Sequence, residues 1–285
     1  MNREEQLQWE TEKRLPAGLA AIASALLVFA GSVYFQVSVR EADDAAELLR
    51  LLDEDAAPAI ISGFVQGLGL LLLAVPLVYL FRAVRLRRER IPMVGLVLAV
   101  IAPVGYAIVA AARQFALVSA AGDFVGGSAV PGETAADRAE DVIRDSAVSV
   151  IGGISLGLGL ALGFAVILIS MNAMRAGLTS RFLGVIGIIV GALYILPVAG
   201  GPQIVQLFWL GALGLLLLDR WPGGRGPAWE TGQAEPWPTA ADQRAMVEAM
   251  KEAAAPPDKG GDDAAEDEPP RPASRKRKGK SRRRR

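Results

Sequence analysis

One pentapeptide has the residue types of a serine nucleophile. Gly153-Ile154-Ser155-Leu156-Gly157 matches the G-x-S-x-G pattern, in which a serine between two glycines attacks an acyl carbon. That motif requires a strand-to-helix turn and a base that takes the serine proton. Here Ser155 lies inside a long apolar block, and the chain contains no histidine. We therefore interpret Ser155 as a packing residue of a helix.

The absence of histidine and cysteine excludes much other chemistry. The chain has no thiolate nucleophile, no imidazole base and no disulfide, and it lacks the ligands of most zinc, haem and iron–sulfur sites. The acidic loops do not have the spacing of a calcium-binding EF-hand, and no phosphate-binding Walker loop is present. We therefore predict a protein that is not an enzyme and that holds no cofactor and no metal.

Polar side chains within apolar blocks are the remaining candidates for a site, because polar groups are costly inside a bilayer. The strongest candidates are Gln66, Arg113, Gln114 and Gln206. If the apolar block that ends at Ala112 continues as a helix, Arg113 would face Gln66 or Gln206 across a small cavity open to the outside. The alternative is an arginine whose side chain extends to the headgroup region. No carboxylate lies deep in any block, which argues against coupling to protons or sodium.

The elements that must hold these residues are long apolar segments. A helix that crosses about 30 Å of hydrocarbon needs roughly 20 apolar residues. Four blocks meet this requirement, and each is predicted to be a transmembrane helix. They are residues 16–39, 59–81, 91–112 and 147–171.

Two further apolar blocks are shorter, and they end the membrane region. Residues 182–199 and 203–219 are joined by Gly200, Gly201 and Pro202. They form either a tight hairpin of two full spans or a re-entrant pair. With the hairpin, the sequence predicts an all-α, polytopic membrane helix bundle of about six transmembrane helices.

Glycines recur at four-residue spacing within these blocks. Because lipid tails are as apolar as leucine, helices in a membrane associate through close packing, which small residues allow. The pairs predict tight helix contacts or a homo-oligomeric interface, and the alternative is chance in a chain with 31 glycines. The pairs are Gly63 and Gly67, Gly153 and Gly157, Gly159 and Gly163, and Gly187 and Gly191.

The charges of the connecting segments predict the orientation. Lysine and arginine gather before the first block, between the second and third, between the fourth and fifth, and after the sixth, whereas the other two loops are acidic. Because basic loops stay in the cytoplasm, both ends are predicted to be cytoplasmic. The richness in alanine, glycine, arginine and proline is typical of GC-rich bacteria, and it places the chain in a bacterial cytoplasmic membrane. The predicted parts are a cytoplasmic N-terminus (1–15), the bundle (16–221) and a disordered cytoplasmic tail (222–285).

The tail is rich in proline, glycine, alanine and charge, a composition that does not fold alone. One short helix is predicted over residues 239–255, capped by Thr239. Near an anionic leaflet each basic residue adds about 1 kcal/mol of attraction, so anionic lipid headgroups are the expected partner. Nucleic acid or the ribosome is the alternative, although no aromatic residues lie between the basic ones to stack on bases. The basic cluster comprises Arg275, Lys276, Arg277, Lys278, Lys280, Arg282, Arg283, Arg284 and Arg285.

Three short motifs carry a resemblance. Arg14-Leu15-Pro16-Ala17-Gly18 begins the first block, and Leu196-Pro197 and Trp209-Leu210-Gly211 lie in the closing hairpin. With the six-span layout, they resemble uncharacterised bacterial membrane proteins grouped as a domain of unknown function, over roughly residues 14–221. The resemblance implies no activity and no catalytic residue, and the long charged tail departs from the compact members.

Two functions of different classes stay open. The first is a non-enzymatic membrane scaffold or accessory protein whose basic tail binds anionic lipid or a partner, which the tail and the lack of buried charge favour. The second is a small-solute transporter or channel with a cavity near Gln66, Arg113 and Gln206, which kinked, glycine-rich helices favour. The expected partners are the lipid bilayer, its anionic headgroups and, through the glycine pairs, a second copy of the chain.

Overall fold

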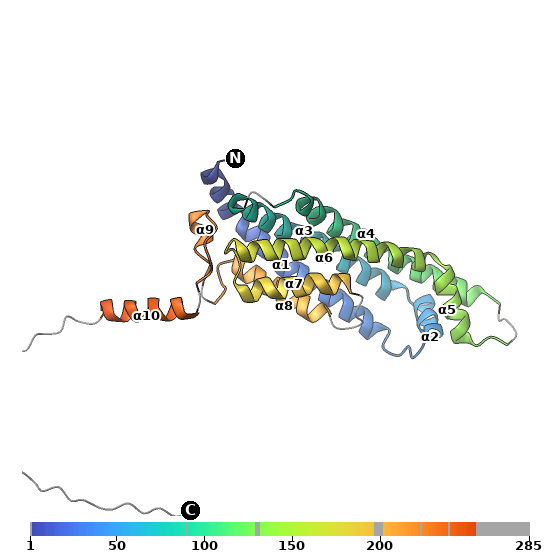
Figure 1. Cartoon of the computed structure of the whole chain (residues 1–285). Helices are drawn as coiled ribbons and strands as arrows, with labels where there is room; N and C mark the ends of the chain where they lie inside the picture. Colours follow the sequence, from blue (N-terminus) through green and yellow to red (C-terminus); the bar gives the residue numbers. More distant parts are fainter. Residues whose placement is uncertain are drawn as a thin grey trace, which may run out of the picture. The chain divides into compact units, whose positions relative to one another are not determined.

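The structure is a computed structural model that describes residues 2–88, 91–128, 132–196, 202–222, 224–238 and 240–254. All regular elements within these ranges are helices (Figure 1). The chain divides into two compact units, Met1–Pro238 and Thr239–Arg285. The first unit is a helix bundle, which confirms the all-α fold.

Four long apolar helices form the frame of this bundle. By length and composition each could cross a membrane, which indicates insertion into one and confirms the four long segments. Even the shortest of them has 29 residues, about 44 Å at 1.5 Å per residue, so all four extend beyond about 30 Å of hydrocarbon. They are α1 (Arg3–Ser38), α3 (Ala57–Arg87), α4 (Val94–Gly126) and α6 (Ala147–Arg175).

A pair of shorter apolar helices completes the bundle. Helix α7 (Arg181–Ile195) has 15 residues and α8 (Pro202–Leu217) has 16, about 22 and 24 Å. Both are shorter than the hydrocarbon layer, so the described residues contain four helices of full spanning length and one short pair. Residues 197–201, which include Pro197, Gly200 and Gly201 of the predicted connection, lie outside the described residues.

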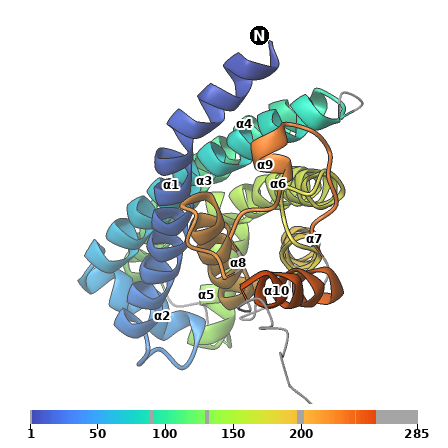
Figure 2. The ribbon, with the colours of Figure 1, turned by 90° about the vertical axis from the view of Figure 1, so that its left-hand side faces the viewer.

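The helices pack in an order that places chain neighbours and distant segments together. Helix α1 packs against α3 and α8, α4 lies between α3 and α6, and α6 pairs with α7. Figure 2 views this arrangement along the bundle from the end where the N-terminus lies. At the contact of α1 with α8, a Cβ placed on Gly18 would lie 2.8 Å from Leu218 Cγ, so only glycine allows this approach. The close packing joins the first and last helices of the bundle.

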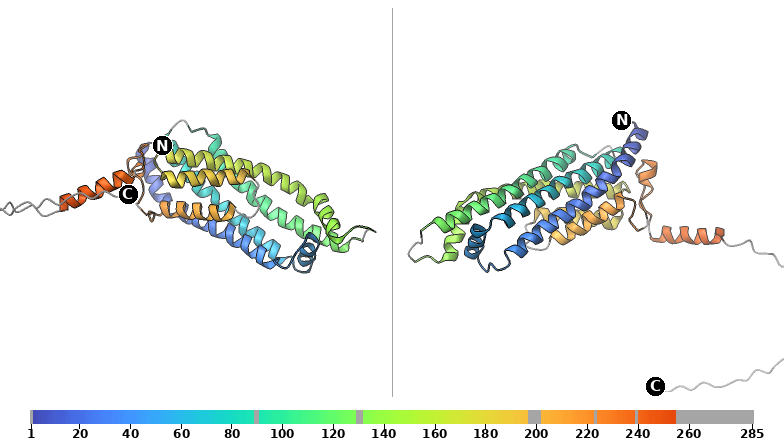
Figure 3. Two further views of the ribbon diagram at one scale, coloured as in Figure 1. Left: turned by 60° about the horizontal axis from the view of Figure 1, so that its bottom comes forward. Right: turned by 180° about the vertical axis from the view of Figure 1, so that it is seen from behind.

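The two ends of the bundle carry different elements (Figure 3). We call the end with α2 (Ala45–Glu54) and α5 (Ala135–Asp145) the acidic end, and the end with the start of α1 and with α9 (Ala228–Thr231) the basic end. Asp44 and Thr134 cap α2 and α5, and Thr134 forms a capping box with Asp137. The buried Leu49 and Leu52 of α2 face an apolar cluster on α4.

Residues that follow 221, the predicted end of the bundle, belong to the same compact unit as the bundle. The compact unit of the bundle continues to Pro238, and Ala228 and Trp229 are buried against it. The composition of 222–238 is poor in apolar side chains, which predicted disorder. One tryptophan and one backbone carbonyl hold the segment in place, as described below.

The second unit contains α10 (Ala240–Ala254), which confirms the predicted short helix. Its expected cap, Thr239, lies outside the described residues, as do all nine residues of the basic cluster from Arg275 to Arg285. The lipid-binding role of that cluster stays a prediction.

Candidate functional site

The four polar residues selected from the sequence lie in two places. Gln66 packs against α1, where a Cβ on Gly31 would lie 2.8 Å from Gln66 Cγ. Gln114 packs against α3 in the same way, at Gly63, and its buried Oε1 has no hydrogen-bond partner among the described residues. Gln206 lies on α8, on the other side of the bundle. Gln66 and Gln114 therefore fill space left by glycines on neighbouring helices.

Of these four residues, Gln206 alone lines the small cavity beside α7. That cavity has a volume of about 10 Å³, about enough for one water molecule, and it is lined by Val190, Leu193, Tyr194 and Gln206. Neither Gln66 nor Arg113 lines it, and Arg113 is exposed. The transport hypothesis gains no geometric support here and stays a prediction.

The eight glycines selected for helix packing divide into two groups. Gly163 and Gly191 meet across α6 and α7, where a Cβ on Gly191 would lie 2.7 Å from Gly163 O. Gly159 approaches Tyr194 O on α7. Gly153 and Gly157 have nothing within 4 Å of a Cβ and are exposed, and Ser155 between them donates to Ile151 O at 2.8 Å. The glycines at close helix contacts are Gly63, Gly67, Gly159, Gly163, Gly187 and Gly191.

The most densely connected polar group lies at the basic end, where the sequence analysis placed no site. Glu10 of α1 and Arg87 of α3 form a bidentate ion pair with N–O distances of 2.8 and 3.0 Å, and their side chains are 3% and 0% exposed. Arg87 Nε also donates to Ala228 O at 2.8 Å. One buried guanidinium thus joins α1, α3 and the segment that follows α8.

Three aromatic rings cover this ion pair. Tyr79 stacks between Trp9 and Trp229, with ring centroids 5.5 and 5.8 Å apart, and its hydroxyl donates to Glu10 O at 2.8 Å. Trp229 Nε1 donates to Leu178 O at 2.9 Å, in the connection between α6 and α7. The polar atoms of Tyr79 and Trp229 are thus satisfied, as burial requires. The stack fixes four segments of the chain relative to one another.

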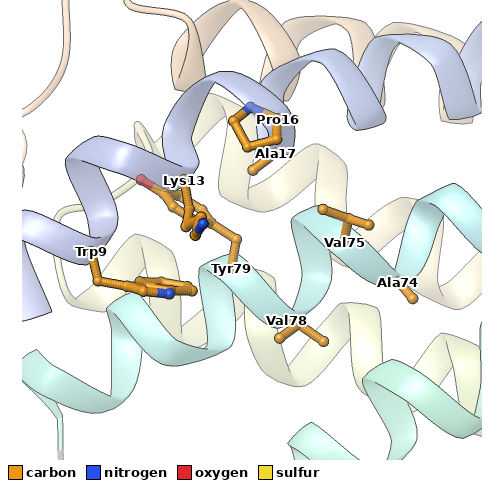
Figure 4. A pocket seen from close by; sticks show the side chains of 8 residues that line it. All are labelled: Trp9, Lys13, Pro16, Ala17, Ala74, Val75, Val78 and Tyr79. Carbon is orange, nitrogen blue, oxygen red and sulfur yellow. The ribbon is translucent and has the colours of Figure 1, made fainter. Parts of the chain in front are cut away.

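An apolar groove of about 460 Å³ opens beside the stack, between α1 and α3. Figure 4 shows Lys13 beside Tyr79, with Trp9 and Ala74 toward opposite ends of the groove. Its walls are apolar and an amine lies at its rim, an arrangement that suits an acyl chain with a phosphate near the amine. The lining residues are Trp9, Lys13, Pro16, Ala17, Ala74, Val75, Val78 and Tyr79.

A second cavity, of about 500 Å³, lies on the opposite face of α1. At 100° per residue, Leu7, Thr11 and Arg14 point away from Trp9, Lys13 and Pro16. The groove has one charged side chain, Lys13, whereas this cavity has four. Its walls are Leu7, Thr11, Arg14, Asp219, Gly224, Arg225, Trp229 and Glu230.

Comparison with known proteins adds nothing to this geometry, since no protein-family model, curated protein or solved structure matches the chain. The resemblance to a family of uncharacterised membrane proteins therefore stays a hypothesis. Function must be argued from the two cavities and the polar network at the basic end.

Proposed function

We propose that this chain is a multi-pass membrane protein that acts as a scaffold or accessory protein, without catalysis of its own. Its basic end faces the cytoplasm, and its tail binds anionic phospholipid beside the bundle. The four long apolar helices and the gathering of arginines at one end support this proposal. A bacterial cytoplasmic membrane is the expected location.

The observation that carries the proposal is the fixed root of the tail. Arg87 holds Ala228 O and Trp229 holds Leu178 O, so residues 224–238 are fastened to the bundle by buried contacts. A chain that leaves a fixed point at the membrane surface keeps its basic residues at a high effective concentration near lipid headgroups. Several basic residues together then give firm attachment, at about 1 kcal/mol each.

The proposal keeps six spans, with α7 and α8 as the last two. The two helices are about 8 and 6 Å shorter than about 30 Å of hydrocarbon, and local thinning of the bilayer accommodates such a mismatch at a cost of fractions of a kcal/mol per ångström. The exposed Leu196, just after α7, would then lie at the side of the membrane where the acidic end lies. A re-entrant pair would keep it within the membrane.

Single cysteines test the orientation and the hairpin, because the chain has no cysteine of its own. We expect a membrane-impermeant maleimide to label Asp43→Cys and Leu196→Cys in intact cells, and to label Arg220→Cys only after the membrane is opened. Asp43 and Arg220 are exposed at opposite ends of the bundle. If Arg220→Cys alone were labelled in intact cells, the orientation would be the reverse of the proposed one. If Leu196→Cys alone departed from the expected pattern and stayed unlabelled, the hairpin would be re-entrant.

A fluorophore on Ser281→Cys tests the role of the tail in the full chain. In bilayers with anionic lipid its emission is expected to shift to the blue, and salt is expected to reverse the shift, because the attraction is screened within about 10 Å at 0.1 M salt. The matched control replaces the nine basic residues of the cluster with glutamine. An equal shift in that control, or in bilayers without anionic lipid, would exclude the proposed attraction.

A further inference from the structure

The charged cavity at the basic end contains two cations and two anions that do not pair with one another. Arg14 and Arg225 line it together with Asp219 and Glu230. The ion pairs found among the described residues join other side chains: Arg40 with Glu41, Arg87 with Glu10, and Arg144 with Asp141. Opposite charges around a space of about 500 Å³ are thus separated by that space. A ligand with both charges would connect them.

Arg225 is the cation most in need of a partner. Its guanidinium lies over the ring of Trp229, 4.2 Å from the centroid, which fixes its position. Its Nε and Nη2 atoms are buried and have no hydrogen-bond partner in the described part of the chain. The neighbouring Tyr79 hydroxyl donates to Glu10 O and interacts with the Arg225 guanidinium, but it is a neutral group and does not balance the charge of Arg225. An anion in the cavity would compensate this charge.

Asp219 holds its carboxylate at the cavity in spite of its backbone conformation. It follows α8 with φ at 62°, and Arg220 N donates to Leu215 O at 2.8 Å, as in a Schellman helix end. Glycine is the usual residue at this position, and aspartate is one of the few other residues that adopt this conformation. Asp219 is the one non-glycine residue with positive φ in the ranges that the structure describes. A carboxylate stands where the backbone alone favours glycine.

The cavity lies at the boundary between hydrocarbon and headgroups. The tight contact of α1 with α8 begins at Gly18 and Leu218. Arg14 precedes Gly18 by one helical turn, and Asp219 directly follows Leu218. These positions coincide with the ends of two apolar blocks, so a molecule in the cavity would lie at headgroup level. A membrane lipid, rather than a free metabolite, is therefore the favoured source of the ligand.

We propose that this cavity binds the headgroup of a phospholipid that carries a phosphate and a primary ammonium group, as in phosphatidylethanolamine. The guanidinium groups of Arg14 and Arg225 bind the phosphate, for which their planar donors are suited. The carboxylates of Asp219 and Glu230 accept hydrogen bonds from the ammonium group. The inference rests on the proposed membrane location, but it requires neither the basic cluster nor a particular orientation.

Native mass spectrometry of the full chain, released from bilayers with equal amounts of phosphatidylethanolamine, phosphatidylcholine and phosphatidylglycerol, tests the site. We expect preferential retention of phosphatidylethanolamine, since the quaternary ammonium of phosphatidylcholine donates no hydrogen bond and phosphatidylglycerol has no cation. Arg225→Gln is expected to reduce retention about tenfold, the loss of one charged hydrogen bond. Arg220→Gln, an exposed neighbour outside the cavity, is the control and should leave retention unchanged.

Asp219→Gly removes the carboxylate without damage to the fold, because glycine suits the backbone conformation at this position. This variant should bind phosphatidylethanolamine and phosphatidylcholine equally while still retaining phospholipid. Equal retention of the three lipids by the unaltered chain, or preference for phosphatidylglycerol, would overturn the proposal. Stabilisation of the detergent-solubilised protein by soluble phosphoethanolamine or inorganic phosphate, as strong as by the lipid, would assign the site to a free metabolite instead.

Separate outcomes distinguish this inference from the proposed function. The chain with the basic cluster neutralised should retain phosphatidylethanolamine as before, because every residue that lines the cavity is unaltered in it. If that variant lost the lipid, the retention would belong to the tail and the cavity assignment would fail. If maleimide labelling reversed the orientation while the lipid preference persisted, the site would stand and only its side of the membrane would change.

Discussion

At the basic end the contacts that hold the bundle join residues far apart in the sequence, whereas at the acidic end the polar contacts are local. The Arg87 guanidinium binds a carboxylate 77 residues away and a carbonyl 141 residues away. At the acidic end, Asp44 and Thr134 bind groups three residues ahead in their own helices. There the long-range contacts are mostly apolar, through the cluster that includes Leu49 and Leu52, with a cation–π contact of Arg50 and Phe124 beside them.

The two kinds of contact differ in how exactly they position the helices that they join. An apolar cluster tolerates small shifts of one helix along another, because its contacts have little directionality. A bidentate ion pair has one geometry, and a buried ion pair adds more to specificity of arrangement than to stability. The basic end therefore fixes α1, α3 and residues 224–238 in one register. This is the part of the molecule where a headgroup site requires such precision.

Replacement of Arg87 is expected to cause the largest loss of stability at either end of the bundle. Arg87→Met leaves Glu10 as a buried, uncompensated charge, and breaking such a pair costs about 3–5 kcal/mol. The loss is measured as the free energy of unfolding in detergent, together with proteolysis of residues 224–238, which should become accessible. A loss of less than about 1 kcal/mol would mean that the pair is solvated and that the basic end is not fixed in this way.

The double variant Glu10→Gln with Arg87→Met is the matched control. With no charge left in the buried site, most of the lost stability should return, because the penalty arises from the unpaired carboxylate. Residues 224–238 should stay accessible to protease, since the bond to Ala228 O is still missing. If stability returns while residues 224–238 stay open to protease, the unpaired Glu10 carboxylate causes the loss of stability, and the missing Arg87 bond causes the release of the segment.

Local contacts can be predicted from the sequence, whereas contacts between distant residues leave no pattern in it. The leucines of α2 and the Thr134 capping box are local patterns, and the apolar blocks of the long helices are local as well. The ion pair of Glu10 with Arg87 leaves no local pattern, because each residue resembles an ordinary charge beside an apolar block. Trp229 leaves no local pattern either: its surroundings are polar, and its partners Leu178 and Tyr79 come from two distant segments.

The glycines show how packing depends on the length of a neighbour. Gly153 and Gly157 have the same spacing as Gly159 and Gly163, yet only the second pair lies at a helix contact. Helix α7 ends at Ile195, level with Gly159, so it covers one half of α6 and leaves the other half exposed. Spacing alone cannot predict where the neighbouring helix ends. Because Gly153 and Gly157 are exposed, contact with a second copy of the chain stays a prediction.

A smaller effect is expected from Leu52→Ala at the acidic end. Leu52 is fully buried on α2, and deletion of a buried leucine side chain costs about 2–4 kcal/mol, toward the lower value where the site can collapse. Leu48→Ala is the control, since Leu48 is half-buried on the same helix and should cost less than half as much. Because the contact is apolar, the loss should not depend on salt, and protease protection of residues 224–238 should be unchanged. A change in that protection would show that the two ends are coupled through α3 and α4, and that the contrast between them does not hold.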